Sequence, residues 1–173
     1  LPTIPGLPIS ISDVFSFYYK STQEFKQTGY GATINGIGVP VGFDNKDRIY
    51  NFPLDFGDTD SCFSDFEISL SGLGYYGHEQ TRLSEVDGWG TLITPYGTFD
   101  VLRVRSEIEA WDTVFADTLG FGFGFTQPTT VEYKWLGSSQ GIPLLQINTT
   151  VSGITGNETV TTIRYRDNLL SGL

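Results

Sequence analysis

Residues 86–104 read VDGWGTLITPYGTFDVLRV, and this stretch decides the fold class. Two short bends, Asp87-Gly88 and Pro95-Tyr96-Gly97, flank one brief strand and lead into a long one. Bends of this kind between β-branched and aromatic residues are typical of antiparallel neighbours. The stretch therefore predicts an antiparallel meander.

The long strand that follows shows the clearest alternation, from Thr98 to Thr113. Leu102 and Val104 lie on one face, with Ile108 and Ala110, and charged residues occupy the other. At ~3.3 Å per residue such a strand spans about 50 Å and must bend or twist strongly. We expect an all-β or mainly β protein, built as a curved antiparallel meander that forms a half-barrel or a sandwich.

Other strands are indicated on both sides of this region. Asn35-Gly36 is the strongest hairpin signal, and Pro40 on the return strand predicts a sheet edge. Further strands are expected at 48–56, 65–70, 131–136, 142–149 and 159–166. The repeated glycines and phenylalanines of 120–125 predict either a mobile flap or a packed aromatic turn.

Length and composition favour one domain. The chain has 173 residues, 14% aromatic residues and 21 glycines, which is typical of a β-rich globular protein. Residues 1–12 are rich in proline and predict an extended N-terminal segment, and 13–173 predict a single β domain. The dense apolar run over 14–19 fits either a short helix or a strand.

Charge and residue usage restrict the function. The net charge of −10 and the isoelectric point near 4.3 argue against a nucleic-acid partner, because binding phosphates needs clustered Lys and Arg. The sequence holds no apolar run long enough to span a membrane. It also holds no methionine, which indicates a processed product or a piece of a longer protein and fits a secreted protein whose leader has been removed.

Several blocks of sequence, in order, resemble a family of exported proteins of the Bacteroidetes that has no established activity. The matching blocks are Tyr30–Ile37, Ile49–Asp58, Gly74–Gly77, Val86–Leu92, Thr94–Phe99, and Tyr133–Trp135 with Gly141–Leu145. Members of that family usually carry a C-terminal secretion sorting domain. The resemblance implies a secreted or cell-surface protein and supplies no catalytic residues.

A looser similarity concerns Thr94–Phe99 alone. This segment is similar to the turn that enters a long strand in proteins with the lipoprotein-carrier half-barrel. It implies the same curved sheet that the long strand predicts.

Catalytic residues are not indicated. His78 is the only histidine and has no nucleophile motif near it, so a surface histidine on a strand is the preferred interpretation. Cys62 is the only cysteine, which excludes an intrachain disulfide, and the acidic residues around it disfavour a reactive thiolate. We therefore predict no enzyme and no required cofactor.

One acidic stretch is a candidate calcium site. Asp58 and Asp60, with Asp65 on the same predicted loop, offer the hard oxygen ligands that Ca²⁺ prefers. A second polar loop is predicted around Asp44, Asn45 and Asp47.

Aromatic side chains give the best indication of binding. Trp89, Tyr96 and Trp135 are the candidate ligand-binding residues, as a stacking platform for sugars or a wall for a lipid. Filling the β core is the competing role for such residues.

Three classes of function follow. The favoured one is a non-enzymatic extracellular or cell-surface module for adhesion, assembly or scaffolding, with other surface proteins or further copies of itself as partners. The alternative is a carrier for a lipid or other apolar small molecule in a half-barrel concavity. A hydrolase or lyase would need two acids converging in a cleft.

Overall fold

The computed structural model describes residues 10–70, 72, 74–117 and 120–167, and these residues contain strands and no helix. The first six strands are β1 (Ile11–Lys20), β2 (Glu24–Ile34), β3 (Ile37–Asn51), β4 (Thr59–Leu70), β5 (Gly74–Thr94) and β6 (Gly97–Ala116). The other four are β7 (Phe121–Thr126), β8 (Thr130–Gly137), β9 (Leu145–Val151) and β10 (Glu158–Tyr165). The all-β prediction is confirmed.

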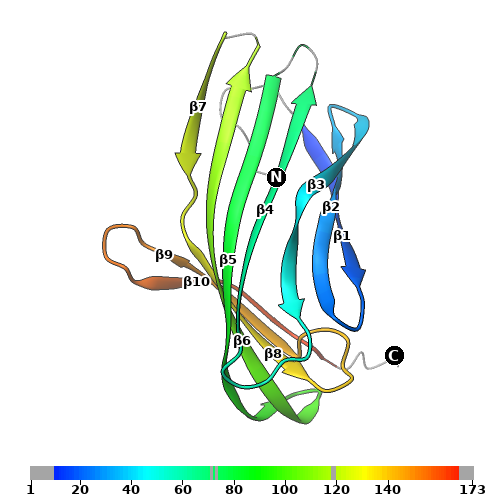
Figure 1. Ribbon diagram of the computed structural model, residues 1–173, viewed down its shortest axis with the longest axis vertical. Helices are drawn as coiled ribbons and strands as arrows, with labels where there is room; N and C mark the ends of the chain where they lie inside the picture. Colours follow the sequence, from blue (N-terminus) through cyan, green and yellow to red (C-terminus); the bar gives the residue numbers. More distant parts are fainter. Residues whose placement is uncertain (1–9, 71, 73, 118–119, 168–173) are drawn as a thin grey trace, which may run out of the picture. The chain divides into compact units, whose positions relative to one another are not determined.

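The strands form one hydrogen-bonded sheet in the order β1-β2-β3-β4-β5-β6-β8-β9-β10, labelled in Figure 1. With the exception of β7, strands that are neighbours in sequence are neighbours in the sheet, which confirms the antiparallel meander. β7 is off this path and pairs with β6. β6 has two partners on one side because residues 101–108 pair with β8 and residues 111–116 pair with β7.

The internal contacts divide the chain into two compact units. Unit 1 comprises residues 1–53, 62–81 and 110–127, and unit 2 comprises 54–61, 82–109 and 128–173. The prediction of a single domain from 13 onward is not tested by this division. Most of the predicted N-terminal segment, residues 1–9, lies outside the described residues, and Ile11 and Ser12 belong to β1.

Unit 1 has an aromatic core. Phe43 and Phe66 stack with ring centroids 5.0 Å apart, and Tyr30 packs on both rings. The buried cluster consists of Val41, Phe43, Phe66, Ile68, Tyr76 and Val114. The alternation predicted for 65–70 is confirmed at Phe66 and Ile68, while the side chain of Leu70 lies outside the described residues.

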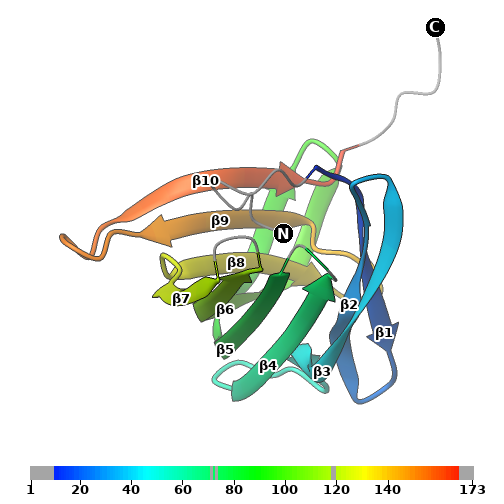
Figure 2. The same cartoon turned by 90° about the horizontal axis from the view of Figure 1, so that it is seen from above.

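Unit 2 has a core of smaller apolar side chains. Val86, Val104, Val131 and Leu144 are almost fully buried, and the alternation predicted for the long strand is confirmed at Val104. In this unit β8, β9 and β10 lie side by side, as Figure 2 shows. The strands predicted near 131–136, 142–149 and 159–166 are these three.

Of the three bends predicted from the sequence, two are turns between strands and one is not. Asn35 and Gly36 join β2 to β3 with φ angles of 48° and 80°, as a type I′ hairpin requires. Pro95 and Tyr96 join β5 to β6, with Gly97 at a φ of 153°. The bend predicted at Asp87-Gly88 is wrong, because both residues continue β5. Val86 exchanges hydrogen bonds with the chain at 57–58, which keeps this part of β5 extended.

Strand pairing decides four further predictions. Of the two alternatives for residues 14–19, the strand is confirmed and the helix is not, because these residues form β1 and pair with β2. The stretch 48–56 is not a separate strand: β3 ends at Asn51. β3 lies between β2 and β4 and not at an edge, although its pairing with β4 is at Asn45↔Asp65, beyond Pro40. Residues 121–126 form β7, so both alternatives for this repeat, a mobile flap and a packed aromatic turn, are wrong.

Candidate functional site

Two of the three predicted ligand-binding residues line one pocket in unit 2. The Trp pocket is a cavity of about 270 Å³ between β5, β6 and β8. Its lining consists of Gly88, Trp89, Gly90, Thr91, Leu92, Val101, Arg103 and Trp135. Arg103 and Trp135 are directly paired across β6 and β8, so the sheet register itself brings them together.

Trp89 is the most conspicuous side chain of the pocket. It is 75% exposed, although tryptophan is usually among the more buried residue types. Trp135 is half-buried. One indole is therefore presented to solvent beside a second one that is anchored in the sheet.

The polar part of the pocket is an ion pair with fixed geometry. Arg103 donates from Nε to Asp87 Oδ1 at 2.8 Å and from Nη2 to Oδ2 at 3.0 Å. These hydrogen bonds raise the pKa of Arg103, so the guanidinium stays charged. The same guanidinium lies 5.8 Å from the ring centre of Tyr133 and 5.9 Å from that of Trp135. The Arg103 guanidinium is thus held by hydrogen bonds to Asp87 and by two aromatic rings.

Tyr96, the third predicted residue, is not among the residues that line the Trp pocket. It lies at the β5–β6 turn, stacked on Phe99 at 5.5 Å, with the Arg166 guanidinium 4.2 Å from its ring centre. Its contacts indicate a packing role at the turn.

The three candidate calcium ligands do not share a loop, so that part of the prediction is wrong. Asp60 and Asp65 belong to β4, and only Asp58 lies in the loop before it. Asp58 Oδ2 accepts from the Asp55 amide, and Asp65 Oδ1 accepts from Asn45. Among the described residues no group of three or more His, Cys, Asp or Glu could hold a metal ion. Calcium binding stays a prediction.

The second predicted polar loop is also wrong. Asp44, Asn45 and Asp47 lie within β3, and Asp47 is buried.

A second depression in unit 2 is lined by charged residues of β4, β5 and β6. It has a volume of about 430 Å³, and Asp60, Glu85, Arg105 and Glu107 contribute to its wall. Arg105 donates to Glu107 at 2.8 Å, which raises the pKa of Arg105. This ion pair agrees with the prediction of a solvated, charged strand face.

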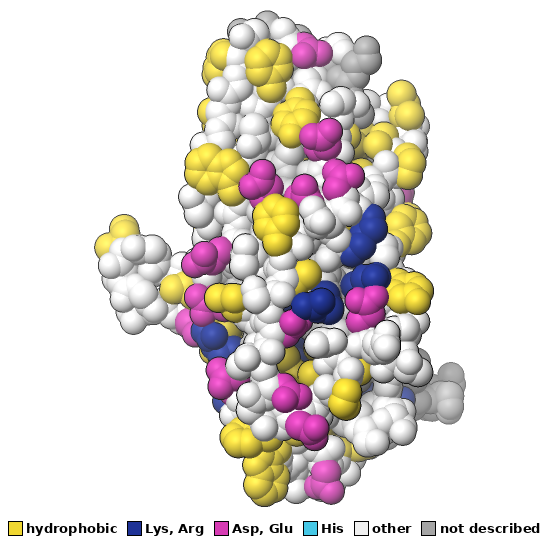
Figure 3. Space-filling view, in the orientation of Figure 1, with side chains coloured by type: hydrophobic (Ala, Val, Ile, Leu, Met, Phe, Trp, Pro, Cys, Tyr) yellow, Lys and Arg dark blue, Asp and Glu magenta, His cyan; other side chains and the backbone are white. Residues whose placement is uncertain are grey.

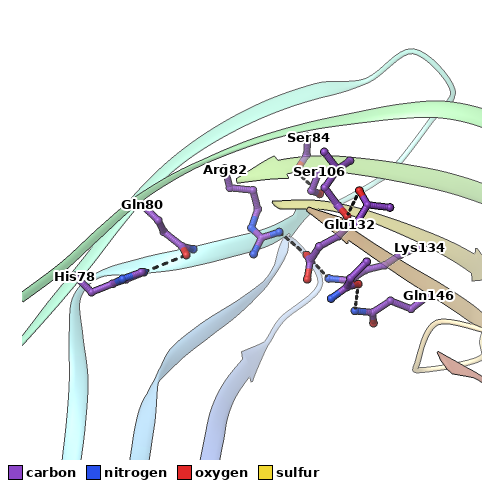
Figure 4. Close-up of polar contacts among 11 residues, drawn as sticks. His78, Gln80, Arg82, Ser84, Ser106, Glu132, Lys134 and Gln146 are labelled. Carbon is purple, nitrogen blue, oxygen red and sulfur yellow. Dashed lines mark hydrogen bonds and ion pairs between the residues drawn. The ribbon is translucent and has the colours of Figure 1, made fainter. Parts of the chain in front are cut away.

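Unit 2 also contains a buried ion triad that sequence reasoning missed. Glu132 Oε2 accepts from Arg82 Nη1 and from Lys134 Nζ, both at 2.7 Å (Figure 4). Burial raises the pKa of Glu132, but the attraction of Lys134 and Arg82 outweighs it and holds the pKa at about 2. Beside the triad, Ser84 and Ser106 share a hydrogen bond of 2.8 Å. In the sequence only the spacing of Glu132 and Lys134 on β8 indicates that these two charges share a face, and it does not reveal whether that face is buried.

Unit 1 contains a second buried acid that sequence reasoning missed. Asp112 is 1% exposed and lies 2.6 Å from His78 Nδ1. Gln127 donates to its other oxygen. Burial, followed by the charge of Asp112, raises the pKa of Tyr76. His78 does lie on a strand, but it is half-buried and bound to a buried carboxylate rather than free on the surface.

Cys62 is half-buried in unit 1. Its Sγ accepts from the Arg48 amide at 3.1 Å.

Aromatic side chains are also exposed along the edge strand of unit 1. Nine of the ten residues of β1 are exposed, and these include Phe15, Phe17, Tyr18 and Tyr19. Within the described part of the chain β1 pairs only with β2. Figure 3 shows hydrophobic side chains reaching the molecular surface between carboxylates. Such exposure is unusual for a monomeric soluble protein.

Comparison with known protein families, with curated proteins and with solved structures gives no match for this chain. In the residues that the structure covers, no helix is long and apolar enough to cross a membrane.

Proposed function

We propose that this chain is a non-enzymatic extracellular or cell-surface module that acts in adhesion, assembly or scaffolding. The observation that carries the proposal is the edge strand β1. Among the described residues no strand pairs with its outer edge, which therefore offers backbone donors and acceptors, and aromatic rings lie on both of its faces because side chains alternate along a strand. Strand addition to such an edge is a general way for β proteins to bind partners.

The location rests on the sequence. The resemblance to exported Bacteroidetes proteins supports a secreted or surface position, and the acidic composition supports solubility. The partners are other surface proteins or further copies of this chain. Protease treatment of intact producing cells tests the location: the chain should be degraded while cytoplasmic proteins survive.

Sedimentation velocity over a range of concentrations tests the association. Phe15 is 63% exposed on β1, and Phe15→Lys places a charge where a partner strand would pair. We expect the wild type to self-associate or to bind a surface partner, and the variant to do so about tenfold more weakly, equivalent to about 1.4 kcal/mol. Ile154→Lys, in the exposed turn between β9 and β10, is the matched control.

Two results would contradict the proposal. One is a wild type that stays monomeric and binds no surface protein. The other is a loss of association in Ile154→Lys equal to that in Phe15→Lys.

A carrier for an apolar small molecule is a second proposal, and the Trp pocket supports a part of it. The pocket has aromatic walls, but its volume of about 270 Å³ lies below the ~300–1,000 Å³ usual for ligand sites. A single ring fits this size better than an acyl chain.

A further inference from the structure

We infer that the Trp pocket is a binding subsite for an uncharged saccharide ring. The inference goes beyond strand addition at β1, because it concerns a different surface in a different unit and a different class of ligand.

The first step of the argument is the aromatic wall. Trp89 exposes most of its indole, and the half-buried Trp135 lies in the same pocket. The C–H groups on one face of a pyranose form an apolar surface that can stack on such a ring. An indole that lines a pocket and is left in water is explained by a ligand that covers it.

The second step is the charge balance. The Arg103 guanidinium and the Asp87 carboxylate neutralise one another through two hydrogen bonds. An anionic ligand would meet Asp87 as well as the chain's net charge of −10, and a cationic ligand would meet Arg103. The pair therefore favours a neutral ligand.

The third step is the hydrogen-bonding capacity that remains. Nη1 of Arg103 makes no hydrogen bond to the residues that the structure describes. The carboxylate oxygens of Asp87 keep lone pairs beyond those that Arg103 uses. Donors and acceptors thus lie side by side, which is what hydroxyl groups need, since each hydroxyl both donates and accepts. A purely apolar ligand would leave these groups unpaired.

The fourth step is access to the backbone. Gly88 and Gly90 line the pocket without side chains. A Cβ on Gly88 would lie 3.5 Å from Cβ and Nε of Arg103, whereas a Cβ on Gly90 would meet no atom within 4 Å. The backbone next to Trp89 is therefore uncovered at Gly90.

The experiment is a ¹H–¹⁵N NMR titration of the whole chain that follows the indole Nε1–H signals. The chain has three tryptophans, and Trp111 lies outside the pocket, so its signal is an internal control. The probes are methyl β-glucoside, cellobiose, maltose, lactose and chitobiose, compared with glucuronate, glucosamine and laurate. We expect at least one neutral sugar to shift the signals of Trp89 and Trp135 and to leave Trp111 unchanged.

Variants locate the binding. Trp89→Ala should weaken the active sugar about tenfold, and Arg103→Lys should weaken it as well because the planar fork is lost. Trp111→Phe should bind as the wild type does. The same spectra report whether each variant is folded.

Three results would overturn the inference: no shift with any neutral sugar, equal binding by Trp89→Ala, or stronger binding of glucuronate, glucosamine or laurate. The sugar titration and the association experiment on β1 can fail independently of one another. A chain that binds sugar but never associates would contradict the proposed strand addition and leave this subsite standing.

Discussion

Glu132 binds two cations inside unit 2, and this makes the stability of the unit depend on the charge of one carboxylate. Its pKa is about 2 in the folded chain, below the ordinary value of 4.5. A lowered folded pKa contributes stability that is complete above the unfolded value and is lost as the pH falls from about 4.5 toward 2. The triad should therefore weaken in that window.

Glu132→Gln tests this at the residue scale. At neutral pH we expect a loss of about 3 kcal/mol in the free energy of unfolding, because two buried cations lose their carboxylate. Between pH 5 and 2 the variant should lose less further stability than the wild type. Urea denaturation at a series of pH values measures both effects, with the exposed Glu109→Gln as the control. Parallel acid profiles for wild type and Glu132→Gln would contradict the assignment.

In unit 1 the buried carboxylate with several polar partners is Asp112. It is buried and interacts with His78, Gln127 and Tyr76, so removal of its charge affects three partners. We expect Asp112→Asn to lower the free energy of unfolding by about 3 kcal/mol, and Asp117→Asn, an exposed neighbour at the end of the same segment, to have little effect. Thermal melts followed by circular dichroism compare the two; similar melting temperatures would show that the Asp112 contacts contribute little.

At the scale of the elements, β2 and β3 approach closely at one paired position. Gly29 and Gly42 face one another in the register. A Cβ on Gly29 would lie 2.2 Å from the Val41 carbonyl oxygen, whereas a Cβ on Gly42 would meet nothing within 4 Å. The pair thus offers a matched comparison of the same substitution.

We expect Gly29→Ala to destabilise the chain by about 2 kcal/mol, since the two strands must move apart. Gly42→Ala should stay within about 1 kcal/mol of the wild type. Chemical denaturation of wild type, Gly29→Ala and Gly42→Ala measures these changes in the free energy of unfolding. An equal effect at both positions would mean that β2 and β3 are less closely packed than their register indicates.

The same elements show why some predictions succeeded and others failed. Asn35-Gly36 is decided locally, because its φ angles need residues that tolerate the left-handed region. Asp87-Gly88 is a similar dipeptide but stays extended, because the adjacent Val86 exchanges backbone hydrogen bonds with the chain at 57–58. A contact with a segment distant in sequence thus overrides a local turn preference.

The candidate site also depends on both local sequence and contacts between strands. The chemistry of Trp89 and Trp135 makes them binding candidates from the sequence, but only the register of β6 with β8 places Trp135 beside Arg103. Nothing near Asp87 and Arg103 in the sequence indicates that they pair. The buried acids Glu132 and Asp112 look like surface residues until the buried face of each strand is known.

For the whole molecule, the long strands β4, β5 and β6 each contribute residues to both units. Loss of one unit would therefore break strands that the other also uses. We expect one calorimetric transition, and we expect Glu132→Gln and Asp112→Asn, which lie in different units, to lower the same melting temperature. Two separate transitions, each lowered by one of these variants, would show that the units unfold independently.

The burial of the ion triad also changes how the chain meets other molecules in solution. Arg82 and Lys134 are two of only ten cationic side chains, so eight remain to offset the acids that face water. The exterior behaves as a polyanion with a cloud of counterions. Two copies that meet edge to edge must compress these clouds, and added salt lowers that repulsion. Pairing through β1 should thus strengthen as ionic strength rises, the reverse of a complex that is held together by opposite charges.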